Sequence, residues 1–135
     1  MTKRTVPVVT FERFTEIAEE ELALLPDYVH KDLNGGVITD EKEYLHPAAV
    51  DDDLYILGTY SRSGIMGNQI VLYYGSFIKS FGDADDETYR TQIRGTLRHE
   101  FLHHLESQAG LYGKGTLVEE DRNRMIKYFV RKGLL

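Results

Sequence analysis

Hydrophobic residues recur along the chain with two different spacings, and the change between them separates predicted helices from predicted strands. Near the amino end the spacing is helical from Thr10, a residue type that caps helices, to Leu25, and Pro26 ends the helix. The apolar stripe of this predicted helix consists of Phe11, Phe14, Ile17, Ala18, Leu22 and Leu25. One face of the helix is therefore expected to pack against the rest of the fold.

The middle of the chain predicts strands. The Asn-Gly-Gly turn at 34–36 leads into a short strand at 37–39. Two segments rich in β-branched and aromatic residues, "DDLYILGTYSR" and "NQIVLYYGSF", predict strands at 54–60 and 69–74. The turn at 64–67 would join them as an antiparallel hairpin, and "SFIKSF" after it is expected to form a helical turn.

The last third of the chain predicts two further helices. The longer one begins at Asp83 or Asp85, carries acidic residues in its first turn, and ends near Gly110. The final helix covers 116–135, with one apolar face made of Val118, Met125, Ile126 and Phe129. Together these elements predict an α+β fold with a small mixed or antiparallel sheet and flanking helices, as one domain over residues 1–135.

Composition narrows the classes of partner and compartment. The chain has 16 basic and 22 acidic side chains and a net charge of −6, which argues against a nucleic-acid partner. It has no cysteine, so neither disulfides nor thiolate metal ligands are available. No segment is long enough to span a bilayer and no secretory signal is visible, so we expect a cytoplasmic protein without a membrane partner. Arg90, Arg94 and Arg98 recur every four residues and are expected to pair with nearby acidic side chains.

One motif carries chemistry. The stretch "TLRHEFLHHLE" contains His99, Glu100 and His103 in the spacing H-E-x-x-H. On a helical wheel the two histidines lie opposite an apolar stripe formed by Tyr89, Ile93, Leu97, Phe101 and Leu105. The motif therefore lies on the face that does not enter the core.

The spacing of the motif favours a metal site. Side chains four residues apart on a helix stand one turn apart, so the imidazoles of His99 and His103 can converge on one ion. Glu100 is angled away from that line and could accept a proton from a water that the metal activates. Two histidines and a carboxylate with an open position are typical of catalytic zinc, so we expect one Zn²⁺ ion, although another divalent metal would also suit these ligands.

The third metal ligand has more than one candidate. Glu106 shares the histidine face but lies seven residues beyond His99, so its carboxylate must lean back toward the helix start to reach the ion. Glu119 or Asp121 of the final helix could supply the ligand instead if the loop before that helix folds it back. The sequence leaves these three residues open.

Other polar residues have weaker claims on function. His104 lies beside the packed stripe and is expected to be a half-buried wall residue, whereas His30 and His46 lie in polar loops and are expected at the surface. Tyr112 could donate a hydrogen bond to an oxyanion, although a packing role is the better interpretation.

Most of the chain resembles a known family. The segments "TFERFTEIAEEELALLP", "LYILGTYSR" and "QIVLYYGSFI", in this order ahead of "LRHEFLHHLE", resemble the small bacterial zincin-like metallopeptidases with a minimal zincin fold. The resemblance implies His99 and His103 as metal ligands, Glu100 as the catalytic glutamate, and an edge strand near Gln69–Tyr74 that borders the metal cleft. The family motif continues with a glycine and a ligand aspartate, where this chain has Glu106 and Ala109.

These observations predict a zinc-dependent metallopeptidase that hydrolyses peptide bonds in a peptide or protein substrate bound in an extended conformation, with Glu100 as general base. The alternative is a metal-binding domain without useful hydrolysis that acts as a scaffold or partner-binding module. An open, water-bearing metal position in a groove favours the enzyme, and a closed four-ligand site favours the scaffold.

Overall fold

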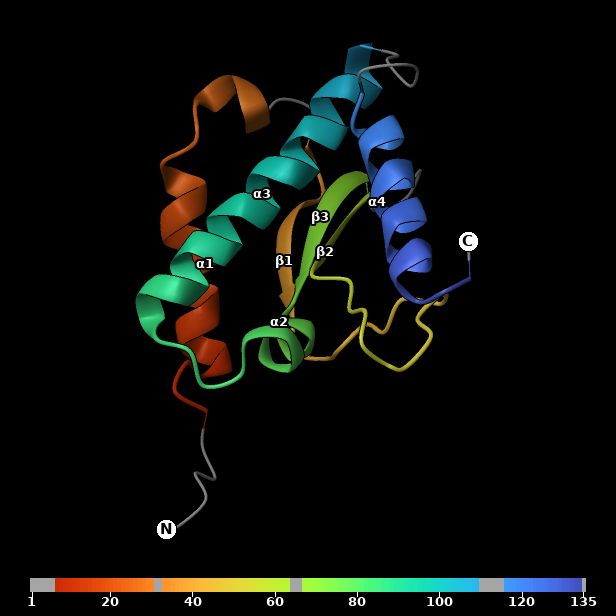
Figure 1. Ribbon diagram of the computed structural model, residues 1–135. Helices are drawn as coiled ribbons and strands as arrows, with labels where there is room; N and C mark the ends of the chain where they lie inside the picture. Colours follow the sequence, from red (N-terminus) through yellow and green to blue (C-terminus); the bar gives the residue numbers. More distant parts are fainter. Residues whose placement is uncertain (1–6, 31–32, 64–66, 110–115, 135) are drawn as a thin grey trace, which may run out of the picture.

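The elements follow one another in the order that the hydrophobic pattern predicts (Figure 1). The computed structural model describes residues 7–30, 33–63, 67–109 and 116–134, which form a mixed α+β fold with four α-helices and a three-stranded sheet. No helix among these residues is long and apolar enough to cross a membrane. The elements are α1 (Phe11–Ala23), the 3₁₀ turn η1 (Asp27–His30), β1 (Gly36–Asp40), β2 (Gly58–Ser63), β3 (Gly67–Tyr73), α2 (Tyr74–Phe81), α3 (Asp86–Ala109) and α4 (Leu117–Arg131).

The sheet is mixed, with β3 in its centre. β1 pairs parallel with β3, where Val37 lies opposite Ile70, and β2 pairs antiparallel with β3, where Tyr60 lies opposite the same residue. The predicted β2–β3 hairpin is thus confirmed. The prediction that the strand near Gln69–Tyr74 is an edge strand is wrong, because β1 occupies its other side and leaves β2 as an edge.

The strand predicted from residue 54 begins later, at Gly58. The residues before it pair with an earlier part of the same loop instead of with β3. Leu45 and Tyr55 form an isolated antiparallel bridge, and the backbone N–H of Ile56 donates to the carbonyl of Tyr44 over 2.8 Å. The connection between β1 and β2 therefore has its own local structure.

Side-chain caps fix where two helices begin. Thr10 Oγ1 accepts a hydrogen bond from the backbone N–H of Arg13 over 3.1 Å at the start of α1. Asp85, rather than Asp83, accepts from the backbone N–H of Thr88 over 2.9 Å at the start of α3. The expected helical turn after β3 is the full helix α2, and Gly110, the expected end of α3, lies outside the described residues.

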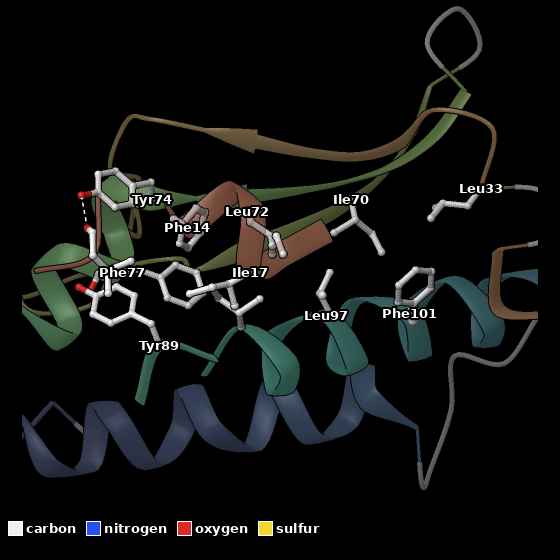
Figure 2. Packing of buried hydrophobic residues seen from close by; sticks show 13 residues of the cluster. Phe14, Ile17, Leu33, Ile70, Leu72, Tyr74, Phe77, Tyr89, Leu97 and Phe101 are labelled. Atoms are coloured by element: carbon white, nitrogen blue, oxygen red, sulfur yellow. Dashed lines mark hydrogen bonds between the residues drawn. The ribbon is translucent and has the colours of Figure 1, made fainter. Parts of the chain in front are cut away.

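The core fills the space between the sheet and the helices α1, α2 and α3. In Figure 2, Phe14 and Ile17 of α1 meet Leu72 of β3, while Leu97 and Phe101 of α3 lie along the same cluster. Both of these α3 residues are almost completely buried. Burial of this stripe fixes the rotation of α3 about its axis, so its opposite face, which carries the motif, turns away from the core.

A buried carboxylate ties α1 to α3. Glu21 is only 4% exposed and accepts hydrogen bonds from Arg90 and Arg94 over 3.0 and 2.5 Å. These bonds, first that from Arg94 and then that from Arg90, lower the pKa of the Glu21 carboxyl below its ordinary value. The expected pairing of the arginine stripe is confirmed for these two arginines, whereas Arg98 is exposed.

Candidate metal centre

Helix α3 presents both histidines of the motif on the side opposite its buried stripe. The side chains of His99 and His103 are 23% and 21% exposed, and their ring centres lie 4.9 Å apart. The i, i+4 spacing thus brings the two imidazoles together as the sequence predicts. Burial is the main cause of a lowered pKa at His99, which favours the neutral imidazole that a metal requires.

Asp121 of α4 faces both histidines. Its Oδ1 lies 3.2 Å from His99 Nε2, and its Oδ2 lies 2.9 Å from His103 Nε2. Among the described residues these three side chains form a group that could hold a metal ion, with one ligand atom from each and all three atoms within 4.8 Å of one another.

The rotation of α4 explains why Asp121 points inward. Leu117 and Tyr128 are the buried residues of this helix, whereas Ile126, expected on the buried face, is 46% exposed. The predicted apolar face of the final helix is therefore wrong in part. Asp121 lies four residues after Leu117 and seven before Tyr128, which places it on the same inward face.

Glu106, the first candidate for the third ligand, occupies a different place. Its two carboxylate oxygens accept from the backbone N–H of Leu117 over 3.1 and 3.2 Å. A carboxylate at this position satisfies a free donor in the first turn of α4 and interacts favourably with the helix dipole. The structure brings neither Glu106 nor Glu119 into the group that Asp121 forms with the histidines.

The donor set fits a zinc ion. In a tetrahedral site with bonds of about 2.0 to 2.1 Å, ligand atoms stand about 3.3 Å apart. With one ligand atom from each of His99, His103 and Asp121, all three atoms lie within 4.8 Å of one another, so small side-chain shifts would bring them to that spacing. Catalytic zinc sites have three protein ligands, and two neutral imidazoles and one carboxylate supply that number. The fourth position of the ion then stays free for water or substrate.

Glu100 lies beside this group on the wall of the same cleft. It is 7% exposed, and burial raises its pKa to about 8, with a further contribution from the negative charge of Asp121. In the metal-free chain Glu100 therefore holds its proton at neutral pH. It is adjacent to His99 in the sequence but, unlike Asp121, lies outside the group of possible ligands.

An open cleft of about 860 Å³ contains the three possible ligands and Glu100. Its walls are α3 from Gln92 to His103, the edge strand β2, the loop before β2, and α4. Figure 1 shows α4 beside the second half of α3, with the loop between β1 and β2 below it. His46, expected at the surface, lines this cleft. Only the folding of its loop brings it there, so no local signal in the sequence could have found it.

A glycine allows β2 to approach the metal helix closely. A Cβ atom at Gly58 would lie 2.9 Å from Cγ2 of Thr96, closer than carbon atoms approach one another. Gly58 and Thr96 both line the cleft. The missing side chain thus sets the width of the cleft between the edge strand and α3.

His104 belongs to the core. It is completely buried, and its Nδ1 lies 2.8 Å from the hydroxyl of Tyr60, a β2 residue that lines the cleft. It was expected to be half-buried at a wall, and its burial is deeper than that. Tyr112, a candidate oxyanion donor, lies outside the described residues.

Comparison with known proteins identifies a relative among solved structures. No family model and no curated protein matches the sequence. A conserved hypothetical protein from Thermo thermophilus is 31% identical, and the match covers 75% of this chain and 98% of that protein with a TM-score of 0.64. The identity and the coverage together exceed what a shared fold alone would give. The chain belongs to the same protein family as this conserved hypothetical protein.

Proposed function

We propose that the protein is a zinc-dependent metallopeptidase. The observation that carries the proposal is the convergence of His99, His103 and Asp121 in an open cleft, with Glu100 beside them. This combination is typical of metal-dependent hydrolases, in which three protein ligands leave a position free and a neighbouring glutamate moves the proton.

Each residue has a distinct role in the proposed reaction. His99, His103 and Asp121 would hold the ion and fix its position in the cleft. A zinc ion bound there supplies Lewis-acid chemistry, since it lowers the pKa of a coordinated water to about 7 and polarises the substrate carbonyl. The positive charge of a bound ion would lower the pKa of Glu100, so its carboxylate would accept the proton of the attacking water and later donate it to the leaving amine nitrogen.

The cleft favours an extended peptide as substrate. β2 is an edge strand of the sheet, so its outer backbone groups can pair with a substrate chain laid along it. We further propose that the fold is a minimal zincin fold. The support is the position of α3, which carries the motif, packs on the sheet with one face, and turns the other toward the cleft beside β2.

A comparison of wild type with Glu100→Gln tests the proposal. Both proteins are loaded with zinc and incubated with a peptide library, and mass spectrometry records new peptide ends. We expect cleavage by the wild type, a loss of at least about 100-fold in the variant, and equal zinc content in both. Zinc bound by both proteins without cleavage by either would favour the non-catalytic scaffold instead.

A further inference from the structure

One wall of the cleft is basic. Arg124, Lys127 and Arg131 of α4 all line it, and we call these three residues the basic ridge. Arg124 lies 3.5 Å from Oδ1 of Asp121 and forms an ion pair with it. Within the described parts of the chain, Lys127 and Arg131 form no ion pair with an acidic side chain. The guanidinium of Arg131 lies 6.0 Å from the ring centre of Tyr128.

The charge of this wall contrasts with that of the chain as a whole. The protein has a net charge of −6, yet the acidic residues among those that line the cleft are only Glu100 and Asp121. Asp121 already contacts His99, His103 and Arg124. At this end Asp53 accepts a hydrogen bond from Tyr128 and pairs with Lys132, so Lys127 and Arg131 remain as the cations of the lining that have no acidic partner among the described residues. Charge on the wall of a cleft attracts ligands of opposite sign.

Lys127 and Arg131 lie at regular distances from Asp121 along α4. At about 1.5 Å per helical residue, Lys127 lies about 9 Å and Arg131 about 15 Å beyond Asp121. An extended peptide advances about 3.3 Å per residue, so these distances correspond to about three and to four or five substrate residues. A peptide that runs along α4 with its cleaved bond at Asp121 would pass both cations on one side of that bond.

We propose that the basic ridge selects substrates with acidic side chains about three and five residues from the cleaved bond. The inference rests on the proposed peptidase function and adds its substrate class. An acidic peptide is favoured over a nucleic acid because the cleft also has an edge strand and the apolar side chains of Leu54, Ile56 and Met125. The edge strand can pair with a peptide backbone, and the apolar side chains of the cleft can contact apolar side chains of the substrate.

Binding to a zinc-loaded Glu100→Gln protein tests the inference without turnover. The probes are fluorescein-labelled 12-residue peptides that contain two glutamates two residues apart, and twins in which both glutamates are glutamine. Fluorescence anisotropy gives Kd for each. We expect the glutamate peptide to bind about 5- to 10-fold more tightly at low salt, because two partly exposed charge pairs contribute modestly.

Substitutions on α4 assign the preference to the ridge. Lys127→Gln with Arg131→Gln should bring the two peptides to equal affinity, and charge reversal to glutamate at both positions should favour a lysine twin. Arg122→Gln is the matched control, since Arg122 is an exposed arginine of the same helix outside the cleft. It should leave the preference unchanged.

Two results would overturn the inference: equal affinity for the glutamate and glutamine peptides in the starting protein, or a preference that survives removal of both cations. Failure of the proposed function has a different signature, because it would show as zinc-loaded wild type that cleaves no peptide of the library. In that case the comparison of Kd values would still show whether the basic ridge prefers acidic peptides.

Discussion

Replacing Glu100 with glutamine should change how the stability of the metal-free protein depends on pH. The ordinary pKa of a glutamate is 4.5, and burial raises that of Glu100 to about 8 in the folded chain. Between these two values the folded protein binds one more proton than the unfolded chain. The free energy of unfolding should therefore fall as the pH rises from about 4.5 to about 8 and level off above that range.

The size of this fall follows from the two pKa values. One pKa unit corresponds to about 1.4 kcal/mol, so the full interval sets an upper limit of about 5 kcal/mol. Water and local relaxation reduce the penalty for charging a buried carboxyl, and we expect about 2 to 4 kcal/mol. Glutamine has no proton to lose, so Glu100→Gln should lack this contribution at every pH.

Urea unfolding in the presence of a chelator measures the effect. The free energy of unfolding is determined for wild type and Glu100→Gln at several values between pH 5 and pH 9. The difference between the two proteins removes the contribution of all other titrating groups. Glu120→Gln changes an exposed glutamate of α4 and serves as the control, with the same pH dependence as wild type. A constant difference between wild type and Glu100→Gln over this range would refute the reasoning.

Three further changes test the assigned roles. Asp121→Asn should weaken zinc binding by more than about 100-fold, measured in competition with a chromophoric chelator, because even residues that only hydrogen-bond to metal ligands contribute about 10- to 100-fold. Glu120→Gln should bind zinc as wild type does. Glu106→Ala should lower the free energy of unfolding by about 1 kcal/mol, because α4 loses its cap, and should still bind one zinc ion at saturation. Loss of zinc binding without loss of stability would contradict this role. Because its arginine partners lower the pKa of Glu21, this residue should add to the loss of stability of wild type as the pH falls below about 4.5. Urea unfolding at pH 7 and pH 3 should therefore show a smaller loss for Glu21→Gln than for wild type.

The sequence predicts those parts of the fold that depend on local periodicity. The spacing of Phe14 and Ile17 locates α1. The spacing of Leu97 and Phe101 locates α3 and turns His99 and His103 away from the core. The hairpin of β2 and β3 follows from two β-rich segments around a glycine turn. Each of these signals lies within the element that it predicts.

The parts that escaped prediction depend on contacts between distant segments. β1 adds to the far side of β3, and this parallel pairing decides that β2 is the edge strand. The choice of Asp121 over Glu106 depends on the rotation of α4, which has few buried side chains to mark its inward face. The sequence places Met125 and Ile126 on the buried face, whereas in the structure Leu117 and Tyr128 are the buried residues of α4.

Zinc content per chain tests the central claim most directly. Wild type and His99→Ala are purified without a histidine tag, supplied with zinc, freed of excess metal and analysed for their elements. The account predicts about one zinc ion per chain in wild type and almost none in His99→Ala. Wild type without zinc, or equal zinc in both proteins, would contradict it.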